Sequence, residues 1–153
     1  MKKLIVSAAL AFSILTIGTT SHAATGNSTK ELAPQEKIVK DFTAQFVSTP
    51  TVTFTDNGYI ASSVVDGHQV SAAYNKKGSR VYSIVRYTSD NLAKNIVDIV
   101  KGTYDKYFIT SMEKIEEPNL KPVFIVHLTN ANSVKTVRVS EDGTELLQNF
   151  RKI

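Results

Sequence analysis

The sequence predicts an α+β fold: a tandem repeat of one helix packed on a four-stranded antiparallel sheet. Three observations lead to this fold class. Apolar residues recur at four-residue spacing in two separate stretches, as on amphipathic helices. After each stretch come segments in which apolar and polar residues alternate, as in strands. Short glycine-containing turns separate these segments, so we expect neighbouring strands to be antiparallel.

The first 23 residues have the organisation of a secretory signal peptide. Lys2 and Lys3 form a positive n-region, residues 4–17 are almost entirely apolar, and Ser21-His22-Ala23 places small residues at a cleavage site. A membrane anchor is the alternative, but the apolar run is short for a bilayer. We therefore expect cleavage after Ala23, a flexible leader over residues 24–33, and a periplasmic or secreted protein without membrane insertion.

The composition suits one domain over residues 34–153. The chain has 153 residues, 42% of them hydrophobic, and it has no cysteine, so its core must stabilise it without disulfides. The formal net charge is +4, of which the signal peptide supplies two. Such a weak positive bias does not favour a nucleic-acid partner, and we expect none.

The first copy of the repeat is expected at residues 34–88. Pro34 suits the first turn of a helix, and Ile38, Phe42 and Phe46 then form an apolar stripe, which predicts a helix over residues 34–48. Alternating segments separated by turns follow it. The strands are expected at residues 51–55, 59–65, 70–74 and 80–87, with turns at residues 56–58, 66–67 and 75–78.

The second copy is expected at residues 89–153. Ser89 or Asp90 is expected to cap a helix that carries Leu92, Ile96, Val100 and Tyr104. The following strands are expected at residues 109–116, 123–129, 134–140 and 144–150, with a longer loop at residues 117–122. An alignment of the copies places Gly78 on Gly143, and both glycines are predicted to close equivalent turns with positive φ.

The turns set the strand registers, and the registers assign each side chain to a face of the sheet. One face is richer in apolar residues and is expected to lie under the helices. Its expected members are Tyr59, Ala61, Val65, Val70, Ala72, Tyr74, Tyr82 and Ile84, and in the second copy Phe124, Val126, Leu128, Val137, Val139 and Leu147.

The other face mixes small hydroxyl residues with isolated apolar residues and few charges. It is either an ordinary solvent-facing surface or a docking surface for another protein. On the second interpretation, the candidate protein-binding residues are Ile60, Val85, Tyr87, Ile125, Arg138 and Phe150.

No combination of residues predicts catalysis or metal binding. After the signal peptide only His68 and His127 remain, on opposite predicted faces, and the sequence has no nucleophile elbow and no glycine-rich phosphate loop. Glu113, Glu116 and Glu117 are expected to be a solvated run. Tyr104, Tyr107 and Phe108 are expected to belong to the core. We therefore expect no enzyme activity, no catalytic residue, no metal and no cofactor.

The repeated helix stripes, the aromatic-rich strands and the turns at residues 74–78 and 139–143 resemble the PepSY-like, β-lactamase-inhibitor-protein-like family of Bacteroidota envelope proteins. The resemblance covers nearly all of residues 34–153 and implies that the two four-stranded sheets join into a single curved sheet with an open concave face. Asn75 and Ser140 depart from the aspartate usual before the glycine loop, and the inhibitor's disulfides cannot form here. The resemblance therefore supports the fold better than it supports inhibition.

These observations predict an exported, non-catalytic binding module, with an inhibitor or sensor of an envelope protein as its candidate roles. Its expected partner is another envelope or secreted protein. The alternative is a small-ligand-binding or enzymatic domain of cystatin-like or cone-shaped α+β fold, which also packs a helix on a curved sheet. A deep closed pocket would favour the alternative, whereas a shallow open trough would favour the binding module.

Overall fold

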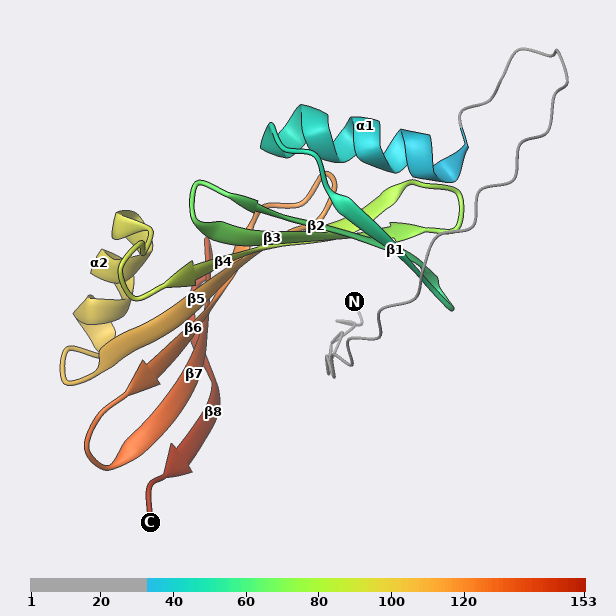
Figure 1. Cartoon of the computed structure of the whole chain (residues 1–153). Coiled ribbons are helices and arrows are strands. Elements are labelled where there is room, and N and C mark those ends of the chain that lie inside the picture. The colour runs from blue at the N-terminus through green and yellow to red at the C-terminus, as the bar shows by residue number, and fades with distance from the viewer. Residues whose placement is uncertain (1–32) are drawn as a thin grey trace, which may run out of the picture. The chain divides into compact units, whose positions relative to one another are not determined.

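The computed structural model describes residues 33–153, which form two helices and one eight-stranded antiparallel sheet (Figure 1). The predicted signal peptide and nearly all of the predicted leader lie outside the described residues. The strands follow one another in the sheet in chain order, from β1 to β8. The elements are α1 (Pro34–Phe46), β1 (Thr51–Thr55), β2 (Gly58–Val65), β3 (His68–Asn75), β4 (Arg80–Thr88), α2 (Lys94–Thr103), β5 (Phe108–Glu116), β6 (Val123–Thr129), β7 (Ser133–Ser140) and β8 (Gly143–Arg151).

The helix ends differ from the prediction in two places. The first helix stops at Phe46, because Val47 adopts a left-handed conformation with φ 53° and its N–H bonds the carbonyl of Thr43. The expected capping of α2 by Ser89 or Asp90 is wrong. The N-cap residue is Ala93, which makes no side-chain cap. Neither helix has the length and hydrophobicity needed to cross a membrane, within the part of the chain that the structure describes.

Both helices lie on the same face of the sheet (Figure 1). The helix α1 packs on the first strands through Ile38 and Phe42, and α2 packs on the last strands through Ile96 and Val100. In the figure, β5–β8 turn away from the plane of β1–β3, so the sheet is curved and the helices lie on its outer side. Within residues 33–153, no helix lies on the concave face.

Two apolar clusters form the core, one under each helix, as the sequence predicted. The buried members under α1 are Ile38, Phe42, Ala61, Val70, Ala72 and Tyr74, and those under α2 are Ile96, Val100, Met112, Val126, Leu128, Val137 and Val139.

A polar contact joins α1 to the sheet. The buried Tyr74 hydroxyl of β3 donates a 2.8 Å hydrogen bond to Oδ2 of Asp41, and Nε of Arg80 lies 3.5 Å from the same oxygen. Burial raises the pKa of Tyr74 above its ordinary value, and the Asp41 carboxylate raises it further. The three side chains therefore tie α1 to two strands beneath it.

The predicted register between β2 and β3 is confirmed: Val65 lies opposite His68, and Tyr59 lies opposite Tyr74. Between β3 and β4, the turn at residues 75–78 predicts Ala72 opposite Tyr82, but Ala72 lies opposite Ser83. A bulge leaves Val81 without a partner, and every later residue of β4 is displaced by one position. Because successive strand residues point to opposite faces, this displacement exchanges the two faces of β4.

The bulge makes several face assignments wrong. Val85 and Tyr87 lie on the helix-covered face rather than the open one, whereas Tyr82 and Ile84 lie on the open face. A second bulge lies in β8 and leaves Leu147 without a partner on β7. The expectation that Leu147 is a core residue is therefore wrong. Its neighbour Leu146 takes the helix-side position opposite Val137, and both leucines remain half-exposed.

The predicted positive φ of the two turn glycines is confirmed, with 79° at Gly78 and 117° at Gly143. The turns themselves are not equivalent, however. Gly143 starts β8 after a two-residue turn, whereas Gly78 lies in a longer loop held by Asn75. The side-chain oxygen of Asn75 accepts hydrogen bonds from the N–H groups of Lys77 and Ser79, at 2.9 and 3.1 Å. Asn75 thus supplies the acceptor oxygen that an aspartate would provide at this position.

Candidate protein-binding face

The sheet face without a helix, called the open face below, is organised in rows that run across the strands. Antiparallel pairing places directly opposed residues side by side on the same face. Three rows cross the middle of the sheet. The apolar row is Ile84, Ile115 and Val123, the charged row is Arg86, Glu113, Ile125, Arg138 and Glu145, and the polar row is Ser111, His127, Thr136 and Gln148.

The apolar row is the most enclosed part of the open face. Only 3% of Ile84 is exposed although neither α1 nor α2 covers it, and Ile115 and Val123 are half-buried. Tyr82 lies on the same strand and face as Ile84 and extends this apolar area. The sequence pattern did not predict this row, because it places Tyr82 and Ile84 on the other face and assigns no face to Ile115 or Val123.

The charged row contains two ion pairs on either side of Ile125. Nε of Arg86 donates to Oε1 of Glu113 at 2.9 Å, and Nη1 of Arg138 lies 3.4 Å from Oε2 of Glu145. Such half-exposed pairs contribute little to stability. In each pair the cation already has an anion beside it.

The polar row borders the charged row. Nδ1 of His127 lies 3.3 Å from the hydroxyl of Thr136, which in turn contacts Gln148. His68 lies on the helix-covered face, where its ring centre is 4.7 Å from that of Tyr87. The two histidines are thus on opposite faces, as predicted. Residues 33–153 contain no group of three or more acidic, histidine or cysteine side chains placed to hold a metal ion.

The structure brings together only some of the candidate binding residues. Ile125 and Arg138 are directly opposed on β6 and β7. Ile60 and Phe150 also lie on the open face, but on β2 and β8, which are far apart in the strand order.

The other two candidates are corrected by the bulge in β4. Val85 packs against the α1 cluster, and Tyr87 packs against the α2 cluster. Both side chains are partly buried on the helix side of the sheet. They are therefore not part of the open face.

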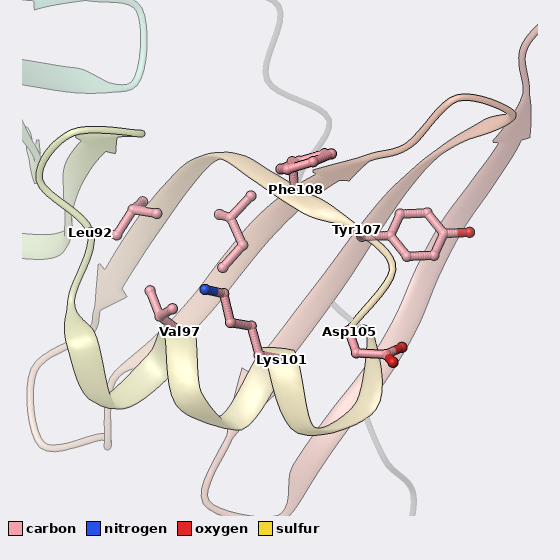
Figure 2. A pocket seen from close by; sticks show the side chains of 7 residues that line it. Leu92, Val97, Lys101, Asp105, Tyr107 and Phe108 are labelled. Carbon is pink, nitrogen blue, oxygen red and sulfur yellow. The ribbon is translucent and has the colours of Figure 1, made fainter.

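A shallow hollow of about 310 Å³ lies on the helix side, between α2 and the start of β5 (Figure 2). The expectation that Phe108 is a core residue is wrong, because 75% of its side chain is exposed at this hollow. Tyr104 and Tyr107 do pack against the α2 cluster, and the Tyr107 hydroxyl lies 2.8 Å from that of Ser133. This hydrogen bond lowers the pKa of Tyr107. The lining residues are Leu92, Val97, Lys101, Asp105, Tyr107, Phe108 and Ile109.

Comparison with known proteins connects this architecture to solved structures. No protein-family model matches the chain, and no curated protein matches it. Three similar structures come from Bacteroides species. A DUF2874 family protein of Bacteroides ovatus is 15% identical, with a TM-score of 0.59 over 82% of this chain and 89% of the other.

The other two structures are a BLIP-like protein and a proposed periplasmic protein. The BLIP-like protein of Bacteroides fragilis is 16% identical, with a TM-score of 0.58 over 80% of this chain and 89% of its own. The proposed periplasmic protein of Bacteroides eggerthii is 10% identical, with a TM-score of 0.56 over 76% and 87% of the two chains. At these identities the likeness concerns the fold. The resemblance to the BLIP-like proteins of Bacteroidota is thereby confirmed for the fold of residues 33–153.

Proposed function

We propose that this protein is an exported, non-catalytic module that binds another envelope or secreted protein on its open face. The observation that carries the proposal is the apolar row on the central strands β4–β6, where Ile115 and Val123 remain partly exposed and no helix of residues 33–153 covers them. An apolar centre bordered by polar and charged residues is the usual arrangement of a protein interface. An inhibitor or a sensor of the bound protein would both use such a surface.

Export is supported by the signal-like first 23 residues and by the fold likeness to the proposed periplasmic protein of Bacteroides eggerthii. The absence of cysteine is compatible with any redox compartment. N-terminal sequencing of the protein from an envelope or culture fraction should begin at Ala24. A product that retains Lys2 and Lys3 would contradict the proposed processing.

The two halves of the chain are proposed to be copies of one ancestral unit. Each half is a helix followed by four antiparallel strands, and each helix buries an apolar pair at four-residue spacing, Ile38 with Phe42 and Ile96 with Val100. Duplication would also explain why the helices lie on the same face. The differences between the two glycine turns then arose after duplication.

Site-specific photo-crosslinking tests the proposed binding face. A photoreactive phenylalanine analogue would replace Arg138 or Phe150 on the open face, and Lys40 on the exposed side of α1 as the control. Each variant is irradiated with the envelope fraction of the producing cell. We expect one adduct of the same mass from both open-face positions and none from Lys40.

A substitution separates binding from folding in the same experiment. Ile125→Asp places a carboxylate between the two ion pairs of the charged row and should remove the adduct at Phe150. The variant must unfold at a temperature within a few degrees of the parent for the loss to count. Adducts that form only from Lys40, or that survive Ile125→Asp unchanged, would place the binding surface elsewhere.

A further inference from the structure

The hollow beside α2 combines an apolar wall with an unpaired cation. Leu92, Val97 and Ile109 supply the wall, and Lys101 lies one turn after Val97 on the same helix. Lys101 has no hydrogen-bond or ion-pair partner among residues 33–153. By contrast, Nζ of Lys94, at the start of the helix, lies 2.7 Å from Asp98. Lys101 is thus the cation of α2 that remains available to a ligand.

The hollow has a cause in the backbone of the sheet. Strand β4 ends at Thr88, which lies opposite Ser111, so residues 108–110 at the start of β5 have a neighbouring strand on the β6 side only. After Thr88 the chain leaves the sheet to form α2. The space that a longer β4 would occupy is open, and Phe108 stands exposed at its border.

Figure 2 shows how the charged groups are directed around this space. The amino group of Lys101 points to the same side as Leu92 and Val97, into the hollow. The carboxylate of Asp105 points away from it. A ligand anion would therefore meet the cation within the hollow and would meet the anion only at the border.

We propose that this hollow binds a small monocarboxylate with an apolar chain or ring. The carboxylate would pair with Nζ of Lys101, and the apolar part would lie along Leu92, Val97 and Ile109. The volume of about 310 Å³ is at the lower end of ligand sites and suits a chain of medium length. Because Asp105 borders the site, a dicarboxylate would be disfavoured. The site lies on the opposite side of the sheet from the open face and does not depend on the function proposed for that face.

An NMR titration of the ¹⁵N-labelled protein with sodium octanoate tests the proposal, with 1-octanol as the uncharged equivalent. We expect octanoate to shift the amide signals of residues 92–109, with a dissociation constant on the order of 0.1–1 mM for so small and open a site. Octanol should bind at least fivefold more weakly. Equal binding of the two compounds, or octanoate shifts centred on the open face, would overturn the proposal.

Three variants identify the contribution of the lysine. Lys101→Gln should weaken octanoate binding at least fivefold and leave octanol binding unchanged, and Lys101→Arg should restore it. Lys106→Gln changes a nearby exposed lysine that does not line the hollow and should have no effect. Lys101 is exposed, so these variants are expected to fold. Unchanged octanoate binding by Lys101→Gln would overturn the assignment of the anion site.

Discussion

The half of the chain built on α1 and the half built on α2 share their order of elements but secure their helices differently. The helix α1 is joined to β3 and β4 by the polar contact of Asp41 with Tyr74 and Arg80, in addition to its apolar side chains. The helix α2 is held by Ile96 and Val100, and its Lys94–Asp98 ion pair stays within the helix. The polar contact thus adds a directional interaction to the packing of α1. Apolar packing, which holds α2 on the sheet, is less directional.

Matched core truncations give the largest expected effects. Ile38→Ala and Ile96→Ala remove the same atoms from the two clusters, and each should lower the free energy of unfolding by about 2–5 kcal/mol. Because β4 and β5 pair along the middle of one sheet, we expect a single unfolding transition in both variants. Two calorimetric transitions, of which Ile38→Ala lowers one and Ile96→Ala lowers the other, would show that the halves unfold independently.

The two turn glycines should respond very differently to valine. A Cβ at Gly78 would lie 2.8 Å from the backbone oxygen of Pro34, at the start of α1, whereas a Cβ at Gly143 would meet open space. Gly78→Val should therefore cost about 3 kcal/mol, from positive φ and steric overlap together, and Gly143→Val about 1 kcal/mol. Chemical denaturation measures both. Equal costs would mean that the close approach of Gly78 to α1 has no energetic weight.

Removing the Tyr74 hydroxyl tests the polar contact that, among residues 33–153, joins α1 but not α2 to the sheet. Tyr74→Phe should cost about 1–2 kcal/mol, because the hydrogen bond to the Asp41 carboxylate is lost. It should also change the dependence of stability on pH. The folded state raises the pKa of Tyr74 above 10.0, so the unfolded state loses this proton first and stability falls as pH rises above 10.0.

The variant should consequently show a shallower loss of stability in that alkaline range. Tyr107→Phe is the control from the α2 half, since the pKa of Tyr107 is lowered rather than raised. It should leave the alkaline loss in place. An alkaline limb that is equally steep with and without Tyr74 would contradict the raised pKa.

The smallest expected effect concerns the ends of the helices. Val47 follows α1 at φ 53° with 90% of its side chain exposed, whereas Tyr104 follows α2 at φ −125°. A β-branched residue is strained in the left-handed region, and its exposed side chain gains little from packing. Val47→Gly should therefore raise the free energy of unfolding by about 1 kcal/mol. Tyr104→Gly should lower it, because Tyr104 packs against the α2 cluster.

The parts of the fold that the sequence predicted well are those with one clear signal. Four-residue apolar spacing located both helices, and Asp66-Gly67 set the register of β2 with β3. The register of β4 could not be derived in the same way. Apolar residues occupy both sets of alternating positions in this strand. Val81 and Val85 belong to one set, and Tyr82 and Ile84 belong to the other. The alternation therefore carried no sign of the bulge at Val81.

The same ambiguity limited the prediction of the candidate site. Adjacent leucines at 146 and 147 leave the phase of β8 undetermined, as the mixed pattern does in β4. The face assignments of Ile125 and Arg138 were correct because their strands alternate regularly and pair without a bulge between them. The exposure of Phe108 depends on where β4 ends relative to β5, which is a property of the assembled sheet and not of either segment.

The bulge at Leu147 also bears on how copies of this protein behave when they are crowded together. β8 is an edge of the sheet, and its nine residues include two leucines and a phenylalanine, a composition that can recruit further strands into fibrils. The residues before and after Leu147 are out of phase with each other. A regular strand of a second chain that pairs with β8 can therefore align its two faces with those of β8 only before Leu147 or only after it. The edge is a poor template for stacking, and the protein can keep an apolar strand there at a reduced risk of aggregation.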